Sequence, residues 1–372
     1  MSFADFNLSP PITKALEEKG YTTPTPIQEK AIPEIITGRD VLGCAQTGTG
    51  KTAAFCIPIL QRLLRRSPTR GIRALILTPT RELAIQVSEN LALYGKYLPF
   101  RHTLVYGGVS QFHQVQQIRN GVDILVATPG RLMDLVSQRV LSIKDLEILV
   151  LDEADRMLDM GFIHDIKKII ALTPPVRQNI FFSATMPAEI QDMVSSFLKN
   201  PVKIRIQGAE KEVENIHQSV YFVDRSHKRA LLKHIINEQD MRNVLVFTRT
   251  KYGADKIAKD LNKAGISAES FHGDKSQNAR VRALNNFKLN TTRVLVATDI
   301  AARGIDILNL PYVINFELPP SQETYTHRIG RTGRAGAKGS AVSLCDAEER
   351  GYLKNISKVS ANDIQIMDHP FS

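Results

Sequence analysis

The segment VLGCAQTGTGKT (41–52) constrains the fold of this chain more than any other stretch. A short apolar run precedes its glycines, and a helix-like segment, AAFCIPILQRLL, follows them. Strand, glycine-rich loop and helix in this order are the context of a phosphate-binding loop. Gly48 and Gly50 allow backbone N–H groups to close around phosphate oxygens, and the following helix N-terminus adds a partial positive charge. We expect Lys51 to reach the β- and γ-phosphates of a nucleotide and the Thr52 hydroxyl to bind Mg²⁺.

One position of this loop departs from the strict pattern G-x-x-x-x-G-K-[ST]. Ala45 stands where the first glycine belongs, and alanine does not readily adopt a positive φ. For this segment alone, a glycine-rich loop that binds no phosphate is therefore the alternative.

A second motif supports a nucleotide site. The stretch EILVLDEAD (147–155) ends an apolar run with Asp152 and Glu153. Carboxylates at the carboxyl end of a parallel strand lie where open α/β sheets bind ligands. We expect Asp152 to bind Mg²⁺, directly or through water, and Glu153 to orient and deprotonate a water that attacks the γ-phosphate. The alternative, a solvated acidic turn, is disfavoured by the phosphate loop upstream, so the chain is predicted to hydrolyse a nucleoside triphosphate.

Short runs rich in valine, isoleucine and leucine recur along the chain with helix-like stretches between them. In the first half they cover 74–79, 123–129, 147–155, 179–185 and 202–206. In the second half they cover 243–250, 293–299, 312–319 and 340–345. Such runs are typical of strands buried on both faces. We therefore predict an α/β fold in which each half is a mostly parallel sheet with helices on both faces.

The stretch QGAEKEVEN (207–215) separates the two halves. It is polar, contains a glycine and lacks apolar periodicity, which is typical of a linker. A chain of 372 residues also exceeds the usual size of one core. We predict two domains, 1–206 and 216–372, joined by this linker.

The formal net charge of +10 favours an anionic partner, with nucleic acid as the first candidate and a basic but unspecialised surface as the alternative. Three cysteines without Cys-x-x-Cys spacing indicate neither a zinc site nor a disulfide framework, which fits a reducing compartment. No apolar run approaches the roughly 18 residues of a membrane span. The N-terminus, MSFADFNLSPP, lacks the pattern of a signal peptide. We expect a cytoplasmic protein that does not enter a membrane.

The stretch YTHRIGRTGRAG (325–336) places Arg328, Arg331 and Arg334 at three-residue intervals, with glycines between them. Each glycine inside a helix costs about 0.5–1 kcal/mol relative to alanine, so a helix that only faced water would not use so many. The pattern requires an explanation for the arginines and for the bare backbone.

The chain resembles the DEAD-box RNA helicases of helicase superfamily 2 over essentially its whole length. The motifs follow in that family's order: GYTTPTPIQ (20–28), AQTGTGKT (45–52), PTRELAIQ (79–86), GG (107–108), TPGR (128–131), DEAD (152–155), SAT (183–185), VFTRT (246–250), HGD (272–274), ATDIAARGID (297–306) and HRIGRTGR (327–334). Ala45 is also what this family carries in its phosphate loop. The short N-terminus and the minimal two-domain length most resemble the bacterial RhlE-type branch. The resemblance implies two tandem RecA-like domains and an ATP-dependent RNA helicase. Its RNA-stimulated ATP hydrolysis would be coupled to domain closure, clamping of the RNA backbone and local unwinding of short duplexes.

The resemblance further implies how ATP is bound. Gln28 would make two hydrogen bonds to the adenine edge, a pattern that rejects other bases. Tyr21 and an upstream aromatic would pack on the ring; Phe3 has the family's spacing and Phe6 is the competitor. Asp306 would bond the ribose. The loop residues around the phosphates would be Ala45, Gln46, Thr47, Gly48, Thr49, Gly50, Lys51 and Thr52. Outside the family, Gln28 is typical of a surface glutamine.

The SAT segment and the last residue of the DEAD motif would couple ATP binding to closure of the domains. By resemblance, Ser183 and Thr185 would hydrogen-bond Asp155, although an ordinary strand-end turn is the alternative.

The arginines would then act across the domains. Arg331 and Arg334 would reach the γ-phosphate as arginine fingers, which contribute roughly 10³–10⁵ in rate, and Arg328 would serve interdomain contacts. The glycines would let the loop approach the other domain without Cβ clashes.

RNA would be held through its backbone. The resemblance implies contacts at strand ends and loops, from Arg81, Gly108, Thr128, Gly130, Arg131, Arg249, Gly273 and Thr298. Such residues recognise backbone shape and not base sequence. Aromatic residues make up 6% of the chain and tryptophan is absent, so no platform for stacking several bases is apparent.

Two rival functions stay open. One is a related P-loop translocase or DNA helicase, because the residues alone do not separate RNA from DNA. The other is an ATP-gated RNA clamp or annealing chaperone without enzymatic output. We expect a monomer whose protein partners act in RNA degradation or ribosome assembly.

Overall fold

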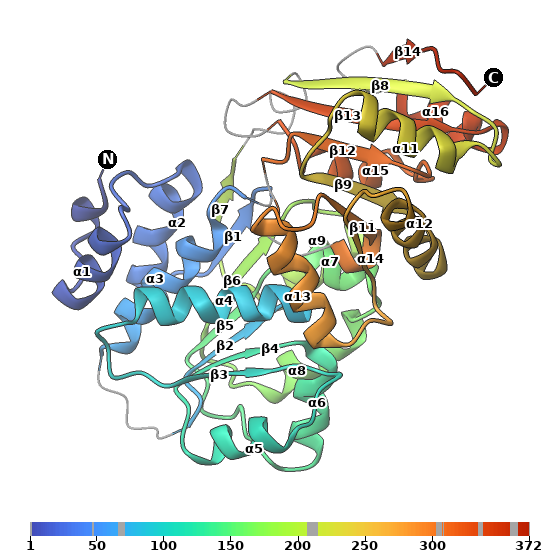
Figure 1. Ribbon diagram of the computed structural model, residues 1–372. Helices are drawn as coiled ribbons and strands as arrows, with labels where there is room; N and C mark the ends of the chain where they lie inside the picture. Colours follow the sequence, from blue (N-terminus) through green and yellow to red (C-terminus); the bar gives the residue numbers. More distant parts are fainter. Residues whose placement is uncertain are drawn as a thin grey trace. The chain divides into compact units, whose positions relative to one another are not determined.

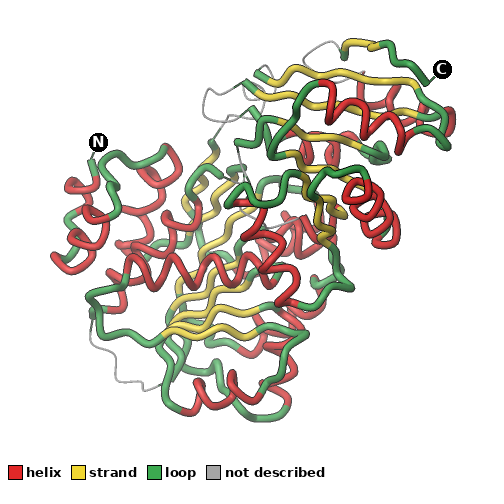
Figure 2. The backbone as a smooth tube through the Cα atoms, viewed as in Figure 1, coloured by secondary structure: helices red, strands yellow, loops and turns green. Residues whose placement is uncertain are grey.

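The chain folds into two compact units, seen in a computed structural model that describes residues 2–46, 48–65, 71–206, 215–302, 307, 309–333, 338–357 and 364–371. The N-terminal unit is Met1–Gln207 and the C-terminal unit is Gly208–Ser372. Each unit is built around a parallel sheet with helices against it (Figures 1 and 2).

The N-terminal sheet has the strand order β3-β4-β2-β5-β6-β1-β7, and every ladder in it is parallel. Its strands are β1 (Val41–Cys44), β2 (Ala74–Leu77), β3 (His102–Val105), β4 (Ile124–Ala127), β5 (Ile148–Leu151), β6 (Gln178–Ser183) and β7 (Val202–Arg205). The connecting helices are η1 (Phe3–Phe6), α1 (Pro10–Glu18), α2 (Pro26–Thr37), α3 (Lys51–Leu63), α4 (Arg81–Tyr94), α5 (Phe112–Arg119), α6 (Pro129–Ser137), α7 (Ala154–Asp159), α8 (Ile163–Leu172) and α9 (Ala188–Phe197).

Alternate side chains of the central strands enter two separate cores. In β2, Ile76 packs on the face that η1 and α1–α4 cover, whereas Leu75 and Leu77 pack on the face that α6–α9 cover. All three are fully buried. Both faces of a parallel strand must be covered, which is why these strands read as continuous apolar runs in the sequence.

The C-terminal sheet repeats this architecture, with the order β10-β11-β9-β12-β13-β8-β14 and parallel ladders throughout. Its strands are β8 (Ile216–Phe222), β9 (Val244–Thr248), β10 (Ala268–Phe271), β11 (Val294–Thr298), β12 (Tyr312–Asn315), β13 (Gly339–Cys345) and β14 (Gln365–Met367). Its helices are α11 (Lys228–Glu238), α12 (Lys251–Lys263), α13 (Gln277–Lys288), α14 (Asp299–Ala302), α15 (Gln322–Ile329), η2 (Ala347–Glu349) and α16 (Arg350–Ser357).

The sequence patterns located the central strands and the edge strand β7 but overlooked β3, β8, β10 and β14. β3 and β10 lie at the edges of their sheets, and their residues are alternately or only partly buried. β8 lies next to an edge and mixes polar with apolar residues. Such strands lack the unbroken apolar run that marks a strand buried on both faces.

Among the described residues, no helix is both long and apolar enough to cross a membrane.

Candidate functional site

Three neighbouring strands of the N-terminal sheet carry the predicted ATP motifs at their carboxyl ends. β6 lies between β5 and β1, and its Phe181 and Ser183 stand opposite Leu151 and Cys44. The loop after β1, the acidic turn after β5 and the SAT segment after β6 therefore meet at one edge of the sheet. This edge is where parallel α/β sheets bind their ligands.

The phosphate loop requires glycine at two of its positions. Gly48 and Gly50 both have a positive φ, 89° and 92°. A Cβ on Gly50 would also lie 2.4 Å from Nε2 of Gln28, so a larger residue would strain the backbone and displace the Gln28 amide. The Thr49 hydroxyl donates to the Gln46 carbonyl at 2.8 Å and closes the turn. Thr47 lies outside the described residues.

Lys51 opens α3 and is almost completely buried. Its Nζ donates to the carbonyl of Ala45, 2.7 Å away, so the ammonium folds back over the loop. Thr52 follows on the same first turn and is half-buried. The lysine, the hydroxyl and the N-terminal end of α3 thus lie together at the loop, as phosphate binding requires.

Asp152 is buried directly after β5. Its Oδ1 has no hydrogen-bond partner within the described part of the chain. Burial raises the pKa of the Asp152 carboxyl; the Lys51 charge opposes this rise and the Glu153 charge adds to it. A buried carboxylate oxygen that lacks a partner fits a cation ligand.

The donor set suits Mg²⁺. Asp152 offers a carboxylate and Thr52 a hydroxyl, and Mg²⁺ prefers oxygen ligands while it keeps several waters or phosphate oxygens. Within the described ranges, no group of three or more His, Cys, Asp or Glu residues is arranged to hold a metal by itself. One carboxylate and one hydroxyl are consistent with an ion that arrives with a nucleotide.

Glu153 occupies a strained turn between β5 and α7. Its φ of 55° and ψ of 50° lie in the left-handed region, which costs a non-glycine residue on the order of 1–2 kcal/mol. Its Oε2 lies 2.7 Å from Nη1 of Arg156, and both side chains are almost fully buried. No motif indicated Arg156, although a residue three positions after Glu153, at the start of a helix, is close enough to form an ion pair with it.

Asp155 is held by the SAT segment. Its Oδ2 accepts from the Thr185 hydroxyl at 3.0 Å and from the backbone N–H groups of Thr185 and Ala184 at 2.8 and 3.1 Å. Ser183 contributes differently, because its hydroxyl accepts from the backbone N–H of Asp155 at 3.3 Å. Burial alone would raise the pKa of Asp155, but the Thr185 hydrogen bonds and the Lys51 and Arg156 charges hold it below its usual value.

Gln28 contacts the phosphate loop through its amide. Its Oε1 accepts from the Thr25 N–H at 3.0 Å, closing a capping box at the start of α2. Its Nε2 donates to the Gly50 carbonyl at 3.1 Å, and the side chain is buried. Both groups predicted to read adenine are therefore bonded to protein, and Gln28 would exchange at least one of these bonds to read a base.

The upstream aromatics form a cluster of edge-to-face pairs. Ring centroids of Phe3 and Tyr21, and of Tyr21 and Tyr94, lie 5.7 Å apart in each pair, and the two tyrosine hydroxyls lie 2.9 Å apart. Phe3 and Phe6 are both buried, and their centroids are 5.6 Å apart. Tyr21 is the more exposed of these rings.

The predicted RNA residues of the N-terminal unit gather at other strand ends of the same sheet. A Cβ on Gly108 (φ 79°) would lie 2.1 Å from Nη2 of Arg81, so the guanidinium lies against bare backbone. Arg131 donates to the Val109 carbonyl at 3.2 Å and so joins this loop to α6. Gly130 is the second residue of that helix, whose N-cap is Thr128, and no protein atom would contact a Cβ there.

The predicted RNA residues of the C-terminal unit follow β9, β10 and β11. Thr298 ends β11 and is buried, and Gly273 is exposed with open space where a Cβ would lie. Arg249 is partly exposed, and its Nη2 lies 3.2 Å from Oε1 of Glu349. Glu349 in turn lies 2.5 Å from Nζ of the buried Lys228. Neither Lys228 nor Glu349 lies in a motif. Because 121 positions separate them in the chain, the sequence alone did not indicate this pair.

The arginine segment is mostly anchored inside the C-terminal unit. Arg328 is almost fully buried and bonds both carboxylate oxygens of Asp299, at 2.6 and 2.7 Å, as well as the Glu317 carbonyl at 2.6 Å. Arg331 is also buried, and its Nη2 donates to the Ala302 carbonyl at 3.4 Å.

At Gly333, packing inside the C-terminal unit explains the glycine, whereas the sequence suggested an approach of the loop to the other domain. The φ of Gly333 is 68°, and a Cβ there would lie 2.6 Å from Cγ1 of Ile216, so packing within the C-terminal unit already requires glycine. Arg334 and Asp306, two further predicted ATP residues, lie outside the described residues.

Comparison with known proteins decides the family. The DEAD/DEAH box helicase model matches residues 25–193, and the helicase conserved C-terminal domain model matches residues 227–336. The chain belongs to the DEAD-box helicase family. The DEAD-box ATP-dependent RNA helicase CshA of Bacillus subtilis (strain 168) is 41% identical over 370 residues, which cover 100% of this chain and 74% of that protein. The RNA helicase CrhR of Synechocystis sp. is 42% identical over 370 residues, covering 99% of this chain and 75% of that protein.

Solved DEAD-box structures share the fold. Saccharomyces cerevisiae Dbp5 bound to RNA and ADP BeF3 has a TM-score of 0.85 with this chain at 29% identity, covering 98% of this chain and 95% of that one. A DEAD box protein from Methanococcus jannaschii is 37% identical with a TM-score of 0.55, covering 99% of each chain. The two parallel sheets are thus tandem RecA-like domains, and the predicted fold class is confirmed.

Proposed function

We propose that this DEAD-box chain is an RNA-stimulated ATPase that clamps the RNA backbone and locally unwinds short duplexes. The ATP-dependent RNA helicase activity follows from its family. The observation that carries the mechanism is the meeting of the phosphate loop with Lys51, the acidic turn with Asp152, and the SAT segment at the carboxyl ends of three adjacent strands. In our proposal residues 1–206 bind ATP, 207–215 link the domains, and 216–372 complete the active site on closure.

Hydrolysis is a direct displacement by water. Glu153 orients a water and takes its proton while the water oxygen attacks the γ-phosphorus. The bond to the β–γ bridging oxygen breaks, and ADP and inorganic phosphate leave. Lys51 holds the β- and γ-phosphates. Thr52 and Asp152 would hold Mg²⁺, directly or through water, and the ion would supply charge neutralisation at the phosphates.

Base selection lies with residues 20–28, which lead into the first turn of α2. Gln28 reads the adenine edge after giving up a bond to the phosphate loop, so adenine binding and loop geometry are linked. Tyr21, with Phe3 or Phe6 behind it, packs on the ring, and Asp306 bonds the ribose. The remaining phosphate contacts come from the loop residues Ala45, Gln46, Thr47, Gly48, Thr49 and Gly50.

The C-terminal domain supplies positive charge when the domains close. Arg331 and Arg334 neutralise the transferring phosphoryl group. Arg331 must then leave its buried position against Ala302, so closure and catalysis are coupled. Arg328 supports this segment from within its own domain through Asp299. Ser183, Thr185 and Asp155 carry the coupling from the ATP site.

RNA binding uses backbone contacts on both domains. The solved Dbp5 structure is bound to RNA, which supports RNA as the ligand here. The contacting residues that we propose are Arg81, Gly108, Thr128, Gly130, Arg131, Arg249, Gly273 and Thr298. Because phosphates dominate such contacts, affinity should fall steeply with salt and depend little on sequence.

We propose a cytoplasmic monomer that works with RNA-degradation or ribosome-assembly proteins. The relatives described above are the RNA helicases CshA and CrhR. They support the DEAD-box family and do not support the RhlE-type branch specifically.

Steady-state ATP hydrolysis tests this function. The intact chain should hydrolyse ATP faster with single-stranded RNA than alone, and faster with RNA than with DNA of the same length. Equal stimulation by DNA would favour a DNA helicase. A chain that binds RNA with ATP but never turns over would be an ATP-gated clamp.

A further inference from the structure

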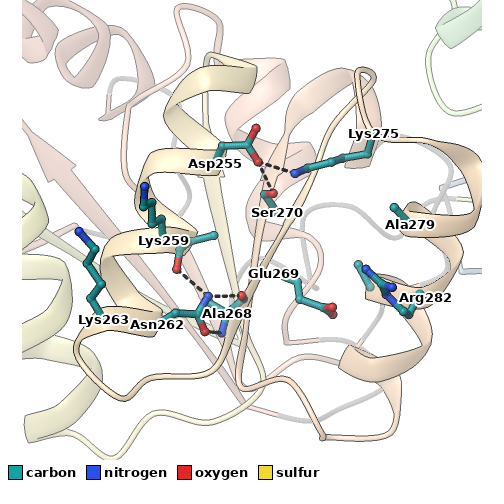
Figure 3. Close-up of a pocket in the computed structure, with 12 residues that line it drawn as sticks. Asp255, Lys259, Asn262, Lys263, Ala268, Glu269, Ser270, Lys275, Ala279 and Arg282 are labelled. Atoms are coloured by element: carbon teal, nitrogen blue, oxygen red, sulfur yellow. Dashed lines mark hydrogen bonds and ion pairs between the residues drawn. The ribbon is translucent and has the colours of Figure 1, made fainter.

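A groove lies along the open edge of the C-terminal sheet. β10 is the outermost strand there, with α12 packed on one face of the sheet and α13 on the other. The groove has a volume of about 640 Å³ and is lined by side chains from all three elements (Figure 3). A sheet edge flanked by two helices can accept an extended chain as an additional strand.

The backbone of β10 is only half paired. The Ser267 carbonyl accepts from the Val294 N–H, so alternation along the strand directs the N–H and C=O groups of Ala268 and Ser270 away from β11. Asn262 of α12 takes the place of a neighbouring strand at the first of these. Its carboxamide donates to the Ala268 carbonyl at 2.7 Å and accepts from the Ala268 N–H at 3.0 Å. Ser270 is the next position at which a bound strand could pair.

The acidic side chains in the groove already have partners. Asp255 lies 2.7 Å from Nζ of Lys275 and accepts from the Ser270 hydroxyl at 2.5 Å. Glu269 accepts from Thr292 at 3.0 Å and from the side-chain amide of Asn286.

The remaining cations line both walls. Lys259 and Lys263 lie on α12, and Arg282 lies on α13. They are exposed, and no ion pair found among the described residues includes any of them. Figure 3 shows the two lysines on one side of β10 and Arg282 on the other. The groove is therefore complementary to negative charge on both walls.

The open edge of β10 favours a polypeptide over a nucleic acid, because a peptide backbone can pair with its unpaired groups. Four alanines, Ala258, Ala268, Ala279 and Ala283, add small apolar side chains to the lining. These small side chains leave room for a peptide chain.

We propose that this groove binds an extended acidic segment of a partner protein, as an additional strand beside β10. Successive side chains of a strand point to opposite faces. Acidic residues at adjacent positions would therefore reach Lys259 and Lys263 on one wall and Arg282 on the other. Acidic residues at alternating positions would reach only one wall. The groove thus selects a pattern of acidic residues.

Two fluorescent peptides of identical composition and charge test the pattern. One is (Val-Asp-Glu-Thr)₃, with adjacent acidic residues, and the other is (Asp-Val-Glu-Thr)₃, with alternating acidic residues. We expect the intact chain to bind the first at least about threefold more tightly by anisotropy, because only it satisfies both walls. Equal affinity, or no binding of either peptide, would overturn the proposal.

Charge reversal in the groove locates the site. The double variant Lys259→Glu/Lys263→Glu should weaken binding of the first peptide about tenfold. The control Lys233→Glu/Lys354→Glu makes the same charge change on α11 and α16 and should leave binding within about twofold. Equal losses in both variants would mean nonspecific attraction to a basic protein.

RNA measurements separate this groove from the RNA path. Both double variants should keep RNA-stimulated ATP hydrolysis and the affinity for a 10-nucleotide single-stranded RNA measured with a nonhydrolysable ATP analogue. If Lys259→Glu/Lys263→Glu alone loses RNA affinity, the groove belongs to the RNA path, and the peptide proposal is wrong although the helicase assignment stands.

Discussion

Glu153 and Arg156 form a buried ion pair, with 2.7 Å between Oε2 and Nη1, at the turn that follows β5. The same glutamate is held in a left-handed backbone conformation. Strain of this kind persists only where the surrounding structure enforces it, and it clusters at functional sites. The carboxylate that we propose as the general base is thus fixed within the N-terminal domain before any ligand arrives.

Glu153→Gln should stop turnover without loosening the site. Glutamine keeps the shape of the side chain but cannot take a proton from water, so kcat should fall at least about 100-fold. RNA binding in the presence of ATP should persist, because the phosphate loop is untouched. The control Glu189→Gln changes an exposed acid on α9 and should leave kcat unchanged. Steady-state hydrolysis and RNA anisotropy measure both effects, and surviving turnover would reject Glu153 as the base.

Thr185→Val should uncouple ATP from RNA. It removes the 3.0 Å hydroxyl contact to Asp155 while the backbone N–H contact at 2.8 Å stays. The loss of one hydrogen bond to a buried carboxylate is worth about 1–3 kcal/mol. We expect the tightening of RNA by a nonhydrolysable ATP analogue to shrink about fivefold or more, with the same loss when RNA tightens the analogue. If the coupling between nucleotide and RNA binding is undiminished, the SAT segment has only a local structural role.

Gln28→Ala distinguishes two roles of one side chain. If Gln28 reads adenine, the preference for ATP over GTP should fall at least about tenfold, because one nucleotide loses its hydrogen bonds and the other does not. If Gln28 only supports the loop through the Gly50 carbonyl, affinities for both nucleotides should fall equally. Competition binding with the two nucleotides measures the ratio.

Gly130→Ala and Gly273→Ala should weaken RNA binding while the fold stays intact. Neither glycine has a positive φ, and no protein atom lies within 4 Å of a Cβ at either position. The free energy of unfolding should therefore fall by no more than about 0.5 kcal/mol. A methyl group would separate the backbone from a phosphate, so RNA affinity should drop several-fold. Gly351→Ala, with equally open space on α16, is the matched control and should leave RNA affinity unchanged.

Local patterns predicted what is local in this fold. The continuous apolar runs of β2, β4 and β5 and the loop around Gly50 identify themselves, because burial on both faces and phosphate binding each impose a sequence pattern. The edge strands β3 and β10 were not predicted, because a strand that is covered incompletely needs no continuous apolar run.

Long-range contacts could not be read from the sequence. The Lys228–Glu349 pair that holds Arg249 joins segments far apart in the chain, and neither residue lies in a motif. The two bonds of the Gln28 amide depend on how α2 meets the phosphate loop, which only the three-dimensional packing reveals. The reason for Gly333 likewise became visible only beside Ile216.

The most direct test of the central claim is RNA-stimulated ATP hydrolysis by Arg331→Lys and Arg331→Ala. If Arg331 of the C-terminal domain acts on the triphosphate held by the N-terminal domain, both variants should lose roughly 10³-fold in RNA-stimulated kcat. Nucleotide binding and thermal unfolding should remain close to wild type in the lysine variant. RNA-stimulated hydrolysis at the wild-type rate in a folded Arg331→Ala chain would contradict the account.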